Sequence, residues 1–313
     1  MKVLVTGGTG YLGRAIVAAL VARGHAPTVF ARSAASSGLP GRLVDGDVRD
    51  AAALARAARG CDAIIHSAAL VSLWRPRRQD FDDVNVGGLE HVLDVARAAG
   101  IGRILYTSSF LALPPADGSS PLECNDYQRT KVRAEEVAAR ASEQGLPVIR
   151  VYPGVIYGPG PVTEGNLVGR LVADHLAGRL PGLIGADRRW SYAFVDDVAE
   201  GHVTALERGA PGARYVLGGE NAPQMRVFEI VRELTGRPLP RRIPLALAKV
   251  AAALDEARAA LTGSPPRLTR GAVELFRHDW ALDSERAMKE LGYRITPLEE
   301  GMPRLLRALR NEE

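Results

Sequence analysis

The chain has 313 residues, which is enough for one large core or for a core with a smaller lobe. Hydrophobic residues make up 46% of it and charged residues 24%, as in ordinary globular enzymes. Acidic and basic residues are interspersed and the formal charge is only +4, so the composition argues against a nucleic-acid partner. The sequence opens without a signal-peptide pattern, and no apolar run approaches the roughly 18 residues that span a bilayer. We therefore expect a cytoplasmic protein without an integral membrane segment.

The N-terminal half alternates short apolar runs with helical stretches, a pattern typical of α/β proteins with a doubly wound parallel sheet of the Rossmann type. Parallel strands are buried on both faces, which accounts for runs that are apolar throughout. In chain order we expect a strand at 3–6, a helix at 11–23, strands at 28–31, 42–44 and 63–66, a helix at 81–99, a strand at 104–107, a helix at 127–144 and a strand at 148–152.

The alternation becomes irregular after residue 157, where proline and glycine interrupt the chain. We expect a smaller C-terminal substrate lobe that is interleaved with the first domain. The dinucleotide-binding domain is predicted over 1–157 plus roughly 190–217, and the substrate lobe over 158–189 and 218–313.

An alanine-rich stretch over 244–263 places four large apolar residues on one face of a predicted helix. We expect this stripe to pack into the core, with a lid over an apolar ligand as the alternative. Its members are Leu247, Val250, Leu254 and Leu261.

A glycine-rich turn joins the first predicted strand to the first predicted helix. Gly7, Gly10 and Gly13 fit the spacing with which such a turn approaches a pyrophosphate, and the helix start adds the N–H groups around Tyr11 and Leu12. Because a strand precedes the triad and a helix follows it, the turn is a strong signal for a dinucleotide. The alternative is a tight turn without a ligand.

The end of the second predicted strand bears on the choice of dinucleotide. NAD sites usually place a carboxylate there, whereas this chain has Arg32 and Ser33, which can bind a 2′-phosphate. We therefore favour NADP and keep NAD open, because Arg32 can instead stack on adenine and tolerate either. Asp47, with Val48 beside it, is expected at the adenine amino group; a helix cap is the alternative for Asp47.

Tyr127 and Lys131 lie four residues apart, which puts them on one face of a helix. A nearby ammonium is expected to lower the pKa of the phenol, so that Tyr127 can exchange a proton with a substrate. Ser109, at the end of the strand at 104–107, is expected to bind the substrate oxygen, with Ser108 as the fallback. Asn85 is expected either to hold the fold or relay a proton, or to be a satisfied core contact. Histidines and cysteines show no metal-ligand spacing, so no metal is expected.

Together these motifs resemble the extended short-chain dehydrogenase/reductase family over nearly the whole chain. Within that family the sequence is similar to the dihydroflavonol-reductase-like branch, and to plant farnesol dehydrogenases in particular. The resemblance implies a Rossmann domain, a smaller substrate lobe, frequently a homodimer, and Ser109, Tyr127 and Lys131 as the catalytic set. The matching segments are 6–13, 66–69, 85–88, 106–110, 127–131, 152–160, 178–182 and 195–198.

The resemblance also assigns the remaining candidate site residues. Ala68, Pro153 and Val155 are expected at the cofactor. Many sugar-nucleotide members carry an asparagine where this chain has Val155, so an apolar residue there favours a lipophilic substrate. Plant farnesol dehydrogenases are described as NAD enzymes, which conflicts with the interpretation of Arg32. The candidate pocket walls, each with core packing as the alternative, are Trp74, Phe110, Leu111, Leu113 and Val155.

The sequence thus favours an oxidoreductase that moves hydride between NADP(H), or NAD(H), and a lipophilic alcohol or carbonyl compound. Tyr127 is the expected general acid and base. An epimerase or dehydratase acting on a sugar nucleotide is the first alternative, because the same catalytic set serves both reactions. A non-catalytic dinucleotide sensor is the second.

Overall fold

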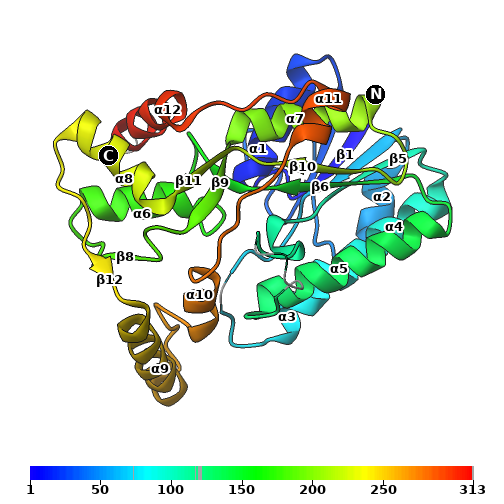
Figure 1. The fold of residues 1–313 in the computed structure, drawn as a ribbon. Coiled ribbons are helices and arrows are strands. Elements are labelled where there is room, and N and C mark those ends of the chain that lie inside the picture. Colours follow the sequence, from blue (N-terminus) through cyan, green and yellow to red (C-terminus); the bar gives the residue numbers. More distant parts are fainter. Residues whose placement is uncertain (73, 117, 119–121, 312–313) are drawn as a thin grey trace.

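The computed structural model describes residues 1–72, 74–116, 118 and 122–311, and a seven-stranded sheet dominates it (Figure 1). All neighbouring strands of this sheet are parallel, in the order β10-β6-β5-β4-β1-β2-β3. The prediction of a Rossmann-type parallel sheet is confirmed. Its strands are β1 (Lys2–Thr6), β2 (Ala26–Ala31), β3 (Arg42–Asp45), β4 (Ala63–His66), β5 (Arg103–Thr107), β6 (Val148–Pro153) and β10 (Arg214–Leu217).

Helices cover both faces of the sheet. Successive side chains of each strand point to opposite faces, so that each face has its own hydrophobic core. Val3 and Val5 pack in the core under α1, α7 and α11, whereas Leu4 packs in the core under α2, α4 and α5. Figure 1 shows these two layers on opposite sides of the strands. The helices are α1 (Tyr11–Ala22), α2 (Ala51–Ala58), α4 (Gly88–Ala99), α5 (Asp126–Glu143), α7 (Val195–Arg208) and α11 (Glu285–Leu291).

The strand order reverses direction at β1, which has β2 on one side and β4 on the other. In sheets of this type a ligand binds outside the carboxyl ends of the strands at such a switch point. The fold therefore directs attention to the loops that follow β1, β2, β4 and β5.

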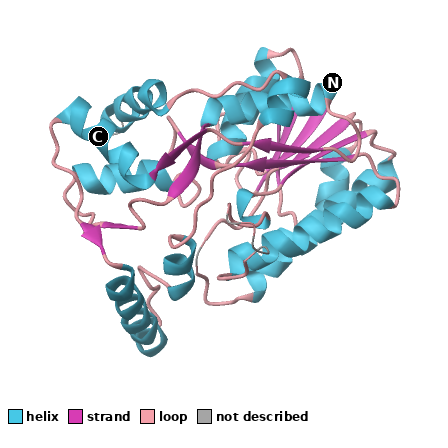
Figure 2. Cartoon of the chain, viewed as in Figure 1, coloured by secondary structure: helices cyan, strands magenta, loops and turns pink. Residues whose placement is uncertain are grey.

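The remaining elements form a second body at the far side from the N-terminus, with two small sheets (Figure 2). One sheet has the order β11-β9-β7 and the other pairs β12 with β8. Thus β7 and β9 pair with each other outside the large sheet, whereas β10 is a strand of the large sheet. The domain limits expected from the sequence stay a prediction. The elements are β7 (Val155–Tyr157), α6 (Leu167–Leu176), β8 (Leu183–Ile184), β9 (Arg189–Phe194), β11 (Glu220–Pro223), α8 (Gln224–Thr235), β12 (Arg242–Ile243), α9 (Leu245–Thr262), α10 (Arg270–Leu275) and α12 (Leu298–Asn311).

The single helix predicted over 81–99 is interrupted. Helix α3 (Gln79–Asp82) continues into a π-helical turn, η1 (Asp83–Gly87), before α4 begins. Asn85 lies in this turn, where its side chain accepts from the Leu70 N–H at 2.7 Å and donates to Thr130 Oγ1 at 2.9 Å. These buried bonds make Asn85 a satisfied contact that ties the turn to α5, because each pairing offsets its desolvation.

The prediction that the stripe of helix 244–263 packs into the core is wrong. In α9 these four side chains are 58–88% exposed, and the helix instead buries Ala248 and Ala252 against Val273 of α10. Within the part of the chain that the structure describes, no helix combines the length and the apolar character needed to cross a membrane. The stripe consists of Leu247, Val250, Leu254 and Leu261.

Candidate active site

The glycine turn after β1 is closed so tightly that side chains cannot enter it. Gly7 has a φ of 72° and faces the end of β4, where a Cβ would lie 2.7 Å from backbone atoms of Ala68. At Gly13 a Cβ would lie 2.1 Å from the Gly7 carbonyl oxygen. The Gly10 N–H donates to the same oxygen at 2.9 Å. This geometry leads the backbone directly from β1 into α1.

The start of α1 is suited to an anion. Its N-cap, Gly10, provides no side-chain cap, and the first turn holds no acidic residue. A Cβ at Gly10 would meet only the Gly7 carbonyl within 4 Å, so the opposite side of this loop is open. Uncapped N–H groups and the helix dipole favour a phosphate there. The residues therefore fit a dinucleotide, whose pyrophosphate Gly7, Gly10 and the first turn of α1 would hold.

We expect Gly13→Ala to destabilise the protein far more than Gly10→Ala. The added methyl at Gly13 overlaps backbone on the inside of the turn, whereas at Gly10 its contact with the Gly7 carbonyl is 3.2 Å. Overpacking of this kind typically costs about 1–3 kcal/mol. Thermal unfolding of both variants without cofactor is the measurement, and equal melting temperatures would contradict this account of the turn.

The other predicted cofactor residues make contacts within the chain itself, and their contact with a cofactor stays a prediction. Tyr11 donates from its hydroxyl to the Gly158 carbonyl at 3.1 Å, so it ties α1 to the loop after β7. Leu12 is half-buried against the core of the α1 face, and Val48 packs beneath Gly88. Pro153 is the last residue of β6 and precedes the buried Val155.

The loops after β2 and β3 place Arg32 near Asp47. Asp47 accepts from Arg49 at 3.0 Å (Nε) and 2.7 Å (Nη2), and this hydrogen bonding holds the pKa of the Asp47 carboxyl below its ordinary value. The charge of Arg32 acts in the same direction. Arg32 and Ser33 are both exposed, directly after β2. Contact of Asp47 with adenine stays a prediction, because in this structure Arg49 binds its carboxylate.

Helix α5 carries Tyr127 and Lys131 into the crevice. Asn125 caps the helix by accepting from the Gln128 N–H at 2.9 Å, which places Tyr127 in the first turn. One turn later Lys131 is 3% exposed and donates from Nζ to the Thr107 carbonyl at 3.0 Å. Its Nζ lies 6.0 Å from the centroid of the Tyr127 ring. The ammonium is therefore held at the end of β5, beside the phenol.

Burial controls the protonation of both groups. It raises the pKa of Tyr127 to about 12, and the hydrogen bond with the Ser109 side chain only partly opposes it. Burial also lowers the pKa of Lys131 to about 8, with the charge of Glu135 acting in the opposite direction. The expected lowering of the Tyr127 pKa by Lys131 is therefore not found, because burial sets the direction of the shift. Tyr127 is a neutral phenol at pH 7, ready to donate a proton.

The structure separates the roles of the two serines. Ser109 is the N-cap of a short 3-10 helix, η2 (Phe110–Ala112), and its Oγ accepts from the Leu111 N–H at 3.2 Å. Ser108 instead donates from Oγ to Glu135 at 3.1 Å. Since Ser108 is committed to α5, Ser109 is the serine that remains beside Tyr127.

Glu135 was not expected from the sequence. It accepts hydrogen bonds from Ser108, Arg150 and Tyr152, the Arg150 contact being 3.1 Å. It lies four residues beyond Lys131, so the same helical periodicity that linked Tyr127 with Lys131 could have pointed to it. Glu135 joins α5 to β5 and β6 and holds negative charge near the buried ammonium.

The predicted pocket walls divide into two groups. Leu111 and Val155 are buried in one apolar cluster, and Phe110 and Tyr127 pack against it. The Phe110 ring lies 5.4 Å from Trp280 and 6.3 Å from Trp190. Trp74 and Leu113 are half-buried and are not members of this cluster. The proton-transfer residues therefore face an aromatic, apolar lobe.

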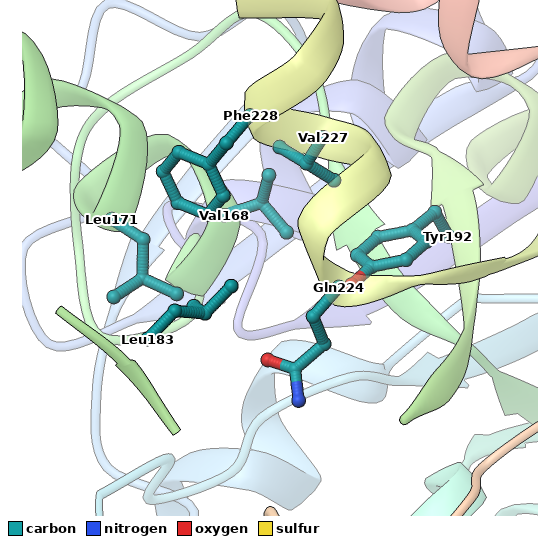
Figure 3. Close-up of a pocket in the computed structure, with 7 residues that line it drawn as sticks. All are labelled: Val168, Leu171, Leu183, Tyr192, Gln224, Val227 and Phe228. Atoms are coloured by element: carbon teal, nitrogen blue, oxygen red, sulfur yellow. The ribbon is translucent and has the colours of Figure 1, made fainter. Parts of the chain in front are cut away.

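A small pocket lies within that lobe, lined mainly by residues of α6 and α8. Figure 3 shows the apolar side chains of Val168, Leu171 and Phe228 facing one another, with Gln224 at the lower edge. Its volume of about 20 Å³ is room for a water molecule, so it is too small for a substrate. The lining is completed by Leu183, Tyr192 and Val227.

Residues 3–218, which contain the glycine turn, Ser109, Tyr127 and Lys131, match the pattern of the NAD dependent epimerase/dehydratase family. The chain belongs to this family. It is an NAD(P)-dependent oxidoreductase of the extended short-chain type that acts on CH–OH groups. The dinucleotide, when bound, supplies or accepts the hydride in such enzymes.

Curated relatives match along most of the chain. Sterol demethylase protein B of Methylococcus capsulatus is 35% identical over 309 residues, with 93% of each chain covered. A putative dihydroflavonol 4-reductase of Synechocystis sp. is 31% identical over 92% of this chain and 88% of its own. Among solved structures, that of gox2253 has a TM-score of 0.84 at 31% identity and covers 99% of this chain and 98% of its own.

Proposed function

We propose that this chain interconverts a lipophilic ketone or aldehyde and its alcohol, with NADP(H) as the preferred cofactor. The observation that carries the proposal is the position of Tyr127, packed against an apolar cluster that contains Val155 and Leu111. A charged nucleotide diphosphate would lose its hydration against such a surface without gaining partners, whereas an apolar substrate gains from burial.

The roles of the side chains follow from their positions. In the reductive direction Tyr127, a neutral phenol, donates its proton to the carbonyl oxygen while Ser109 donates a hydrogen bond to that oxygen. The charge of Lys131, fixed at the end of β5, stabilises the phenolate that remains. In the oxidative direction the same groups act in reverse.

The names of several relatives support this substrate class. They include a 3 beta-hydroxysteroid dehydrogenase/Delta 5-->4-isomerase of Mycobacterium tuberculosis, 32% identical over 77% of this chain, besides the sterol demethylase protein. A ketoreductase of Stigmatella aurantiaca, named for a farnesyl-bearing quinoline oxide, is 32% identical. Together with the resemblance to plant farnesol dehydrogenases, they favour sterol-like or isoprenoid substrates. A cytoplasmic location and a homodimer stay predictions from the sequence.

An absorbance assay of the reduced nicotinamide tests the proposal. Purified protein is offered isoprenoid, steroid, aromatic and short aliphatic carbonyl compounds with each dinucleotide. We expect net oxidation of the cofactor with a bulky apolar carbonyl compound. Conversion of a sugar nucleotide without net change in absorbance would establish the epimerase alternative instead, and cofactor binding without any turnover would establish the sensor.

Arg32→Glu is expected to reverse the cofactor preference. Replacing the guanidinium with a carboxylate removes the partner of a 2′-phosphate and adds repulsion, so kcat/KM with NADPH should fall by about tenfold or more. With NADH, kcat/KM should stay within about threefold, because a carboxylate there can bind the ribose. The exposed Arg56 on α2 provides the matched control Arg56→Glu. Equal losses with both cofactors would contradict a 2′-phosphate contact.

A further inference from the structure

Helix α9 presents apolar side chains to solvent along its whole length. Leu247, Val250, Leu254 and Leu261, here called the α9 stripe, are 61%, 58%, 68% and 88% exposed. Their spacing follows one face of the helix, and the alanines that anchor the helix, among them Ala252, lie on another. Figure 1 shows α9 projecting from the lower edge of the substrate lobe, with α10 as its neighbour. An exposed row of large apolar side chains of this kind marks an interaction surface.

The net positive charge of the protein is concentrated around this helix. The whole chain has 40 basic residues (Lys and Arg) and 36 acidic residues (Asp and Glu). Residues 241–277 contain seven of the basic residues and three of the acidic residues. The rest of the chain therefore carries 33 residues of each sign and is neutral. Among the described residues Arg241 and Arg267 make no ion pair, while the other five basic side chains of the segment are paired yet 42–71% exposed.

A cleft of about 480 Å³ opens at the start of α9. Pro244 and Leu245 contribute to it together with three arginines, one aspartate and several apolar residues. Phe276 on its wall stacks on Trp190 with centroids 5.0 Å apart, and Trp190 in turn neighbours Phe110, which follows Ser109. A continuous row of aromatic rings thus runs from this cleft to the proton-transfer site. The remaining residues that line the cleft are Leu183, Gly185, Ala186, Asp187, Arg188, Arg242, Ile243 and Arg277.

We propose that the α9 stripe and the basic segment 241–277 bind the surface of an anionic lipid bilayer, with α9 lying in the plane of the interface. Leucine and valine side chains would enter the boundary of the acyl chains, and the surplus arginines would lie near lipid phosphates. This combination of apolar stripe and local positive charge fits a negatively charged bilayer, whereas a neutral partner would make no use of the charge.

A second copy of the chain fits the stripe less well. An 18-residue helix is about 27 Å long, so a strip roughly 10 Å wide presents only a few hundred Å². A stable dimer typically buries about 800 Å² on each partner. The α9 stripe alone therefore falls short of a dimer interface but suffices for reversible attachment to a bilayer.

Co-sedimentation with lipid vesicles tests the proposal on the full chain without substrate, so its outcome is independent of the proposed reaction. We expect binding to vesicles of phosphatidylcholine with about one-third phosphatidylglycerol, weak binding to pure phosphatidylcholine, and weakening by salt. The double variant Leu247→Gln, Leu254→Gln should partition about tenfold less. The control Leu234→Gln changes a residue on α8 that is 46% exposed and should bind like the unmodified chain.

Three results would overturn the proposal. Wild-type protein that stays in the supernatant with anionic vesicles would do so, as would a double variant that binds as well as the control. A concentration-dependent dimer that the double variant dissociates, seen by sedimentation velocity in the absence of vesicle binding, would assign the stripe to a second copy instead. Glutamine is a good helix former and both positions are exposed, so the variants should retain the fold.

Discussion

Tyr127→Phe is expected to reduce turnover by roughly 10²–10⁴-fold while the protein still binds its dinucleotide. The substitution removes only the hydroxyl, which is the donor that we place at the substrate oxygen. Lys131 cannot replace it directly, because its bond to the Thr107 carbonyl at 3.0 Å holds its Nζ at the end of β5, 6.0 Å from the centroid of the Tyr127 ring. The ring remains packed against the cluster that contains Leu111, so the fold and the cofactor crevice should be unchanged. Steady-state kinetics and a fluorescence titration of the reduced cofactor measure the two effects separately.

Tyr215 on β10 offers a matched control for the loss of a buried tyrosine hydroxyl. It is 1% exposed and donates to Glu290 at 2.8 Å, in the core under α11. Tyr215→Phe should cost some stability and leave kcat nearly unchanged. Turnover of Tyr127→Phe within a few-fold of the unmodified chain would refute the proton-transfer role, whatever its substrate.

The Rossmann half could be predicted because its signals are local. The strand at 63–66 was expected with the limits that the structure has, since a short apolar run bounded by turn residues has few other solutions. The glycine turn was equally clear, because only glycine tolerates the contact distances found at Gly7 and Gly13. Both features could be predicted because the residues that determine the local backbone lie next to one another in the sequence.

The features that escaped prediction depend on partners distant in the sequence. The π-helical turn around Asn85 exists because its side chain binds Leu70 and Thr130, which periodicity does not reveal. The 3.6-residue pattern of the α9 stripe predicts core packing, because it shows that a face is apolar without showing what covers it. Protonation is a third case: the four-residue spacing identifies the pair, but burial decides the sign of the Tyr127 shift.

Lys131→Met should make the protein more stable at neutral pH even as it impairs catalysis. Burial lowers the pKa of Lys131 from 10.5 to about 8, which means that folding at pH 7 forces a charged group into a site that disfavours charge. By the conversion of about 1.4 kcal/mol per pKa unit, removing the charge returns up to about 3.5 kcal/mol. Loss of the bond to the Thr107 carbonyl would reduce this gain by ~1 kcal/mol. Urea denaturation at pH 7 measures the difference.

The dependence on pH distinguishes this cause from better packing of methionine. Below pH 8 Lys131 is charged in the folded and the unfolded chain, so the full penalty applies; above 10.5 it is neutral in both and the penalty vanishes. Between these values the unfolded chain binds more protons, and the stability of the unmodified protein rises with pH relative to that of Lys131→Met. The variant's advantage should therefore shrink towards roughly pH 10. Lys289→Met, at a side chain 70% exposed, should show no such trend, and an advantage of Lys131→Met that persists unchanged at high pH would mean that the buried charge is not its origin.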